Sequence, residues 1–325
     1  MSTLRIFVDL ATPPDILEML RAGTRGHELV FPHKPITSVL AKGEPDPQFT
    51  TVDIAFGQPD TAAIVQASRL KWIHVSSSGI TRYDTPQFRA AMAQRKIVVS
   101  NSAAVFQDAC AFHLLSFMLA QSRNLPLALN SRASNGTPAW QNLRESCVPL
   151  RGQTALILGY GAIGQRLVEF LRPFDMNILA YRRKPRGNEG IPVITEPDLA
   201  SALAHQADHI INILPDSSET RHFFNAARFA QIKAGAVFYN IGRGSTVDQT
   251  ALRDALHSQR LRAAWLDVTD PEPLPDDHPL RSEPTCFITP HIAGGHTHEA
   301  RTLVQHFLQN FARFTHSQPL LDQVM

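Results

Sequence analysis

The spacing of Gly159, Gly161 and Gly164 is typical of a loop that binds the pyrophosphate of a dinucleotide. The glycines follow the apolar run 155–158 directly and precede a helix-like stretch at 165–172. Gly159 would permit the tight turn, Gly161 would let the backbone approach the pyrophosphate, and Gly164 would allow close helix packing. The helix N-terminus would supply N–H groups and a positive dipole. Because three glycines also occur in this spacing by chance, the prediction of a dinucleotide site depends on this strand-to-helix context.

The residues after the next apolar run bear on which dinucleotide is bound. An NAD(H) site would carry an acidic residue here to bind both ribose hydroxyls. The chain instead has Arg182 and Arg183, followed by Lys184 and Arg186. A guanidinium can hold the adenosine 2′-phosphate through charge-assisted, bidentate hydrogen bonds. We therefore expect NADP(H) as the preferred cofactor and NAD(H) as the alternative; the competing interpretation is a solvated basic loop.

Three further polar side chains follow predicted strands, at the edge where open α/β sheets bind ligands. They are Arg243, Glu272 and His291. Each has a plain alternative: a surface arginine, a loop charge between prolines and a turn histidine. Their joint occurrence downstream of a dinucleotide loop favours a catalytic set.

Alternating strands and helices must position these residues. In the first hundred residues we predict strands at 4–9, 52–56, 72–75 and 97–99, with helices at 15–21, 61–68 and 86–94. A long helix is expected at 104–124 and a loop at 131–138. The alternation then restarts with six strands, at 154–158, 177–181, 209–214, 236–240, 263–268 and 286–289. Asn225 should cap a helix ending at Gly235, and Asp248 one running to about Gln259.

The alternation predicts the α/β fold class, with two doubly wound parallel-sheet domains. One would be a Rossmann NADP-binding domain and the other a flavodoxin-like substrate domain. Residues 1–101 plus 296–325 are expected to form the substrate (catalytic) domain, because the helical segment 296–314 has no sheet of its own. Residues 102–295 would form the dinucleotide-binding Rossmann domain.

Taken together, the motifs resemble the D-isomer-specific 2-hydroxyacid dehydrogenases, a family that includes glyoxylate/hydroxypyruvate reductases and phosphoglycerate dehydrogenases. The resemblance runs from 55–59 and 71–73 through the dinucleotide loop to the Arg, Glu and His segments, in the family's order and approximate spacing. It implies that Arg243 binds the carboxylate and carbonyl of the substrate, that His291 is the acid/base and that Glu272 partners His291. The physics agrees, since a cation and a proton donor would neutralise the charge that hydride transfer builds on the carbonyl oxygen.

The resemblance also implies the remaining contacts. The expected cofactor-binding residues are Gly159, Gly161, Ala162, Ile163, Gly164, Arg182, Arg183, Leu214, Pro215, Ile241, Asp267, His291 and Gly294. Backbone N–H groups should bind the substrate carboxylate together with Arg243, at Gly57, Ser77, Ser78 and Gly79. An ordinary turn after a strand is the alternative for the serines.

The expected reaction is the NADPH-dependent reduction of a small 2-oxo acid, of the glyoxylate or hydroxypyruvate type, to the D-2-hydroxy acid. Within the family, the NADP preference and the segment Phe56-Gly57-Gln58-Pro59 favour these substrates. Two alternatives stay open. One is a non-catalytic NAD(P)H-sensing interaction protein, and the other is an enzyme that oxidises a small anion such as phosphite on the same framework.

Composition and charge bear on which partners to expect, and a small-molecule substrate is the partner that the motifs predict. The 325 residues carry a formal net charge of +2, which gives no general reason to expect nucleic acid or an acidic membrane as a partner. The longest apolar stretch, at 109–120, is too short to span a bilayer, so we expect a cytoplasmic protein. Cys110, Cys147 and Cys286 suit reduced thiols, and no metal site is expected. A homodimer with the helix 104–124 near its interface is the family's implication.

Overall fold

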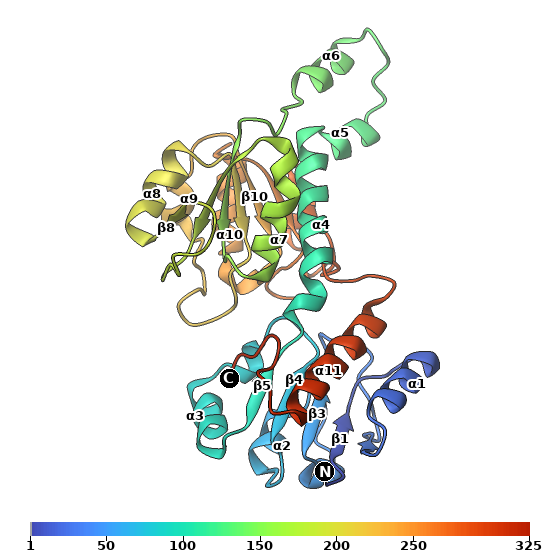
Figure 1. Ribbon diagram of the computed structural model, residues 1–325. Helices are drawn as coiled ribbons and strands as arrows, with labels where there is room; N and C mark the ends of the chain where they lie inside the picture. Colours follow the sequence, from blue (N-terminus) through green and yellow to red (C-terminus); the bar gives the residue numbers. More distant parts are fainter. Residues whose placement is uncertain (1) are drawn as a thin grey trace. The chain divides into compact units, whose positions relative to one another are not determined.

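The computed structural model describes residues 2–325, which form two compact units (Figure 1). The first unit comprises the chain up to Phe106 together with Gly295–Met325, and the second comprises Gln107–Gly294. Each unit contains one parallel sheet packed against helices. The predicted fold class of two doubly wound parallel-sheet domains is confirmed.

The first unit has a five-stranded sheet in the order β2-β1-β3-β4-β5, with every neighbouring pair parallel. Its strands are β1 (Arg5–Val8), β2 (Glu28–Val30), β3 (Ile54–Gly57), β4 (Trp72–Val75) and β5 (Val98–Ser100). This is the flavodoxin-like order, in which the direction of winding reverses between β1 and β3. The sequence analysis missed β2, because this edge strand has only three residues, of which one is fully buried.

Helices α1 (Pro14–Gly23), α2 (Thr61–Gln66), α3 (Pro86–Arg95) and α11 (Glu299–Thr315) complete the first unit. The C-terminal helix α11 supplies part of the core. Its Phe307 ring stacks on Phe56 at 4.4 Å and on Trp72 at 5.3 Å between centroids. Burial of such large rings stabilises the packing of α11 on strands that lie far earlier in the chain.

The second unit has a seven-stranded parallel sheet in the order β12-β11-β10-β9-β6-β7-β8. Its strands are β6 (Thr154–Leu158), β7 (Asn177–Tyr181), β8 (Val193–Ile194), β9 (His209–Asn212), β10 (Ala236–Asn240), β11 (Leu261–Leu266) and β12 (Cys286–Ile288). The order is that of a Rossmann sheet with one added strand, and β6 lies at the reversal point where dinucleotides bind. The expectation of six strands was wrong by one, since β8 has only two residues.

Helices α7 (Ala162–Leu171), α8 (Glu196–His205), α9 (Ala226–Gln231) and α10 (Gln249–His257) connect these strands. The predicted caps are present: the Asn225 side chain accepts from the Arg228 N–H, and Asp248 accepts from the first turn of α10. Helix α9 ends at Gln231 and not at Gly235. The N–H of Gly235 instead donates to the carbonyl of Arg260, which leads the chain into β10.

Helix α4 (Ala103–Ser122) is long and apolar enough, by length and composition, to cross a membrane. Length and composition alone are weak evidence for a membrane span, because a long apolar helix packed in a protein core meets the same criteria. One face of α4 packs within the second unit, where the Trp265 indole N–H donates to Gln121 Oε1 at 2.7 Å. Two short helices follow, α5 (Leu125–Asn130) and α6 (Pro138–Glu145), separated by the predicted loop.

Candidate active site

The predicted cofactor residues lie in segments that follow strands of the second unit, at the carboxyl edge of its sheet: Ala162, Ile163 and Gly164 form the first turn of α7, and the others lie in loops. Two glycines let these loops touch. Gly159 has a φ of +97°, and a Cβ there would lie 2.6 Å from the carbonyl oxygen of Ile213. A Cβ at Gly242 would lie 2.6 Å from the carbonyl oxygen of Leu214. The loops after β6, β9 and β10 are therefore in backbone contact, and larger residues at these glycines would separate them.

The dinucleotide loop has the geometry that its glycines predict. Helix α7 begins directly after Gly161, and a Cβ at Gly161 would face open space among the described residues. A Cβ at Gly164 would lie 3.2 Å from the carbonyl oxygen of Gly159, which is tighter than an ordinary contact. The absence of a side chain at Gly161 therefore leaves the first N–H groups of α7 open to a ligand. These features fit a dinucleotide pyrophosphate.

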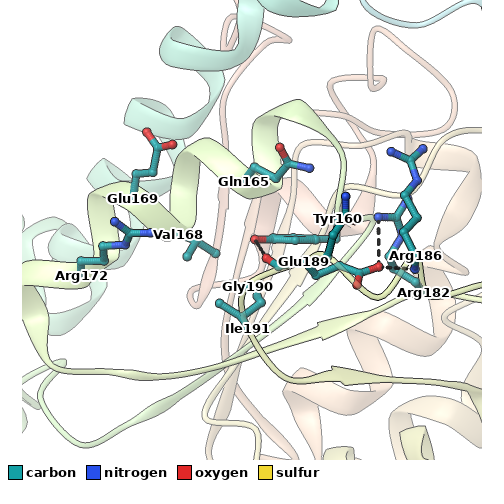
Figure 2. Close-up of a pocket in the computed structure, with 11 residues that line it drawn as sticks. Tyr160, Gln165, Val168, Glu169, Arg172, Arg182, Arg186, Glu189, Gly190 and Ile191 are labelled. Atoms are coloured by element: carbon teal, nitrogen blue, oxygen red, sulfur yellow. Dashed lines mark hydrogen bonds and ion pairs between the residues drawn. The ribbon is translucent and has the colours of Figure 1, made fainter.

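The basic segment after β7 borders a pocket of about 310 Å³ between α7 and the loop that leads to β8. Arg182 and Arg186 line it, and Figure 2 shows the Glu189 carboxylate facing both. Arg182 Nη1 lies 3.5 Å from Glu189 Oε1, which also accepts the Arg186 N–H at 2.6 Å. The hydrogen bond from the Arg186 N–H is the largest cause that holds the pKa of Glu189 below its usual value. The sequence analysis missed Glu189, because a carboxylate seven residues after Arg182 has no motif to identify it.

Arg183 lies differently from Arg182. Its exposed guanidinium forms an ion pair with Glu219, which follows β9. Arg182 is more deeply placed, with 17% of its side chain exposed. Of the two adjacent arginines, only Arg182 lines the pocket, whereas Arg183 is paired with the Glu219 carboxylate.

Arg243 follows β10 and is partly buried. Its Nη1 donates to the carbonyl oxygen of Gly242 at 2.6 Å, and its own carbonyl oxygen accepts from the Asn240 side chain at 3.1 Å. Burial lowers the pKa of Arg243, while the nearby Glu272 and Asp216 carboxylates act in the opposite direction. A partly buried guanidinium near carboxylates remains charged, so it can hold an anionic ligand.

A network of amides and a hydroxyl holds the Arg243 backbone. The Asn212 side chain donates to Asn240 Oδ1 at 3.1 Å and to Thr246 Oγ1 at 2.7 Å. Thr246 in turn donates to the Arg243 carbonyl oxygen at 2.6 Å. The sequence analysis missed this support, because Asn212 and Asn240 end different strands and meet only when the sheet forms. Their only signal is a polar residue at the end of an apolar run.

His291 and Glu272 are in direct contact. His291 Nδ1 lies 2.5 Å from Glu272 Oε1, with 22% and 37% of the two side chains exposed. The His291 backbone has a positive φ of 52°, and its N–H donates to the Asp267 carbonyl oxygen at 2.9 Å. Since Nδ1 is bonded to the carboxylate, Nε2 is the atom that can exchange a proton with a ligand.

Asp267 holds the turn that carries His291. Its Oδ1 accepts from Thr289 Oγ1 at 2.6 Å and from the Ile292 N–H at 2.9 Å, and its Oδ2 accepts from the Ala293 N–H at 2.9 Å. His113 of α4 adds a contact from Nε2 to Thr289 Oγ1 at 3.1 Å. The structure thus shows Asp267, expected as a cofactor contact, bound to the His291 turn. His113 carried no such signal in the sequence.

The expected substrate residues lie in the first unit. Gly57 is the last residue of β3 and has a φ of +132°, while Ser77, Ser78 and Gly79 follow β4. Ser77 Oγ donates to the carbonyl oxygen of Gly79 at 2.7 Å. Gln58, absent from the sequence-based set, connects the two loops. Its Nε2 donates to Ser77 Oγ at 2.9 Å.

Possible metal ligands do not gather in the described chain. Within residues 2–325, no group of three or more His, Cys, Asp or Glu side chains is arranged to hold a metal ion. Arg243, Glu272 and His291 lie in the same unit as the dinucleotide loop.

Comparison with known proteins gives a consistent picture. Residues 115–293 match the family model of the D-isomer specific 2-hydroxyacid dehydrogenase NAD binding domain. The chain is 35% identical to human glyoxylate reductase/hydroxypyruvate reductase, over 72% of this chain and 70% of the relative. It is 34% identical to glyoxylate/hydroxypyruvate reductase B of Salmonella typhimurium, over 89% of this chain and 87% of the relative.

A solved structure extends the similarity to both units. It is the NADPH-dependent glyoxylate/hydroxypyruvate reductase from Sinorhizobium meliloti in complex with NADP and malonate. The alignment has a TM-score of 0.73 and 25% identity, and it covers 99% of this chain and 97% of that chain.

Proposed function

Since the chain belongs to the D-isomer-specific 2-hydroxyacid dehydrogenase family and is an NAD(P)-dependent oxidoreductase, we propose that it reduces a small 2-oxo acid with NADPH. The product would be the D-2-hydroxy acid. The observation that carries the proposal is the contact between His291 and Glu272 in the unit that holds the dinucleotide loop and Arg243. Relatives named as glyoxylate/hydroxypyruvate reductases support glyoxylate or hydroxypyruvate as the substrate.

The proposed roles follow from the charges. Bound NADPH would supply the hydride for the carbonyl carbon of the substrate. Arg243 binds the substrate carboxylate and stabilises negative charge on the carbonyl oxygen. His291 donates the proton from Nε2 to that oxygen, and Glu272 orients the ring through Nδ1 and stabilises its charged form.

The preference for NADPH is proposed on the position of Arg182. Its guanidinium follows β7, where an NAD(H)-specific site carries an acidic residue, and it lines a pocket together with Arg186. The complex of the Sinorhizobium meliloti relative with NADP supports the same assignment. The other cofactor contacts would come from the loops that contain Gly159, Leu214, Ile241 and Gly294.

The division of labour between the units is also a proposal. The first unit would be the substrate domain and would present N–H groups of Gly57 and of Ser77–Gly79 to the substrate carboxylate. The second unit would bind the cofactor and supply Arg243 as the substrate's cationic partner. The loop positions at the carboxyl ends of β3 and β4 support this assignment, since open α/β sheets bind ligands at that edge.

We propose a cytoplasmic homodimer on the basis of the cysteines and of the exposed apolar side chains. Cys110, Cys147 and Cys286 are all free thiols, which suits a reducing compartment. Large apolar side chains are exposed along α4 and α5, namely Phe112, Leu119, Leu125, Leu127 and Leu129. Such a patch favours association with a second copy.

Product analysis tests the reaction. NADPH and NADH oxidation would be followed with glyoxylate, hydroxypyruvate, pyruvate and phenylpyruvate, and phosphite would be tested with each oxidised cofactor. The proposal predicts NADPH-dependent formation of the D-2-hydroxy acid. Turnover of phosphite alone would replace it with anion oxidation. Cofactor binding without turnover of any of these compounds would favour an NAD(P)H-sensing protein.

A further inference from the structure

The winding of the first unit reverses between β1 and β3, and a buried carboxylate lies at this point. Asp9 follows β1 directly, and Gln58 follows β3 directly. In doubly wound sheets, ligands bind outside the carboxyl ends of the strands at the reversal. Only 3% of Asp9 and 1% of Gln58 are exposed. Two buried polar residues therefore lie at the expected ligand-binding position of this sheet.

Asp9 fixes the backbone at the end of β3. Its Oδ1 and Oδ2 lie 2.8 and 3.1 Å from the N–H nitrogen of Gln58. Gly57 has a φ of +132°, and a Cβ there would overlap the Asp9 carboxylate. The missing side chain of Gly57 thus lets the carboxylate reach the N–H of the next residue.

The Gln58 side chain connects the fixed backbone at the end of β3 to the loop after β4. Its Nε2 donates to Ser76 Oγ at 3.2 Å and to Ser77 Oγ at 2.9 Å. Its carbonyl oxygen accepts the Gly43 N–H at 3.0 Å. A continuous set of hydrogen bonds therefore runs from Asp9 through Gln58 to Ser77, whose hydroxyl donates to the Gly79 carbonyl.

A charged carboxylate destabilises the fold at this buried position, because it loses its hydration. Burial raises the pKa of Asp9 to about 7, although the Gln58 N–H and the charge of Arg82 act in the opposite direction. Arg82 itself donates to the carbonyl oxygens of Ala41 and Leu40. An amide or apolar side chain would avoid the desolvation of a charge. Residues that destabilise the fold in this way are concentrated at functional sites.

We propose that Asp9 and Gln58 are positioning residues for the substrate, which hold the N–H groups of Gly57 and of Ser77–Gly79 in place to bind the carboxylate of a 2-oxo acid. The inference rests on the proposed function, because it needs an anionic substrate at these loops. Neither side chain takes part in hydride or proton transfer. Their contribution is the fixed orientation of donors before the substrate arrives, which saves the free energy of ordering them on binding.

The test compares Asp9→Ala, Asp9→Asn and Gln58→Ala in the full-length protein. Asp9→Ala removes the acceptor of the Gln58 N–H, whereas Asp9→Asn keeps an oxygen acceptor and removes the charge. We expect Asp9→Ala and Gln58→Ala to raise KM for the 2-oxo acid about tenfold, with kcat changed by less than about twofold. Asp9→Asn should restore KM to within about threefold of the unaltered protein. The Kd of NADPH should be the same in all three, since the dinucleotide loop belongs to the other unit.

Calorimetric binding of malonate to the NADPH complex separates this inference from the proposed function. Loss of malonate affinity in Asp9→Ala and recovery in Asp9→Asn would support positioning even if the unaltered protein reduces no 2-oxo acid. An unchanged KM and malonate Kd in folded Asp9→Ala and Gln58→Ala would overturn the inference while leaving the proposed function intact. An Asp9→Asn variant as impaired as Asp9→Ala would also overturn it. Failure of the unaltered protein both to bind malonate and to turn over would overturn both.

Discussion

His291 Nδ1 lies 2.5 Å from Glu272 Oε1, on a turn whose N–H groups are held by the buried Asp267 carboxylate. Nδ1 of His291 thus contacts the Glu272 carboxylate, and the backbone that carries the ring is held by the Asp267 carboxylate. This arrangement leaves Nε2 for proton transfer. This relationship is the structural basis of the proposed reduction.

Removing the charge of Glu272 should slow turnover. In Glu272→Gln, the amide can still accept from Nδ1 but no longer stabilises a charged imidazole ring. We expect kcat to fall about 100-fold, with the Kd of NADPH unchanged. Steady-state kinetics and fluorescence titration with NADPH measure the two quantities.

The chain offers a matched control for this variant. His257 Nε2 lies 2.6 Å from Glu283 Oε2, so the same pair of side chains occurs at the end of α10 and before β12, away from the loops of the site. Glu283→Gln should keep kcat within about twofold of the unaltered protein. Equal losses in the two variants would show that the effect of Glu272→Gln is not catalytic.

Arg243 should tolerate no replacement, lysine included. We propose that its planar guanidinium binds a carboxylate and a carbonyl oxygen together, and an ammonium cannot reproduce that geometry. We expect Arg243→Lys to lower kcat/KM for a 2-oxo acid about 100-fold or more, with NADPH binding retained. Arg253→Lys, at an exposed position of α10, is the control and should be neutral. Near-normal turnover of Arg243→Lys would remove Arg243 from the substrate site.

The two adjacent arginines should differ in their effect on cofactor choice. Arg182 lines the pocket beside α7, whereas Arg183 is paired with Glu219. Arg182→Ala should weaken NADPH binding about tenfold or more and leave NADH binding unchanged, because only NADPH carries the 2′-phosphate. Arg183→Ala should have a smaller effect. If Arg182→Ala leaves the NADPH/NADH preference unchanged, the phosphate assignment fails.

How far the sequence predicts this site depends on how local each feature is. The strands Thr154–Leu158 and Asn177–Tyr181 were predicted with their bounds, because a continuous apolar run before a turn is a local pattern. The short edge strands β2 and β8 carry no such pattern and were missed. Helix α9 ended early because its last predicted turn bonds to another segment, which no local signal reveals.

The same distinction holds for the side chains. The pairing of Glu272 with His291 could be expected from the family's motif, and the structure brings the two together. The hydrogen bond from Gln58 to Asp9 joins residues 49 positions apart and depends on the strand order of the sheet. The same is true of the amide network under Arg243. Contacts of this kind arise only from the tertiary fold.

The stability of the protein should depend on the ionisation of Asp9. Its pKa is raised from 3.8 to about 7 by burial, so the folded state holds the proton more tightly than the unfolded state. The resulting stabilisation is fully present below about pH 4, is lost as the pH rises towards 7, and stays lost above it. Asp9→Asn cannot ionise. The difference between its free energy of unfolding and that of the unaltered protein should therefore move in favour of the variant as the pH rises from about 4 to about 7. Urea denaturation at several pH values measures this difference, and a constant difference would contradict the buried, titrating carboxylate.

The exposed apolar residues of α5 should matter for assembly. Leu129 is 81% exposed, and we expect Leu129→Asp to shift a homodimer towards the monomer in sedimentation velocity. Leu40→Asp is the control, because Leu40 is 49% exposed and belongs to the first unit, whereas Leu129 belongs to the second. A protein that is monomeric before substitution, or dissociation by both variants, would contradict the proposed interface.

We propose that His291 donates the proton in an NADPH-dependent reduction. The rate of single-turnover reduction by His291→Asn tests this role. Asparagine suits this position because it tolerates the positive φ of 52° better than most residues, and its amide cannot act as the acid. The account predicts that the variant binds NADPH with unchanged affinity and that its rate of reduction of glyoxylate or hydroxypyruvate falls at least about 100-fold. Reduction at a rate close to that of the unaltered protein would contradict it.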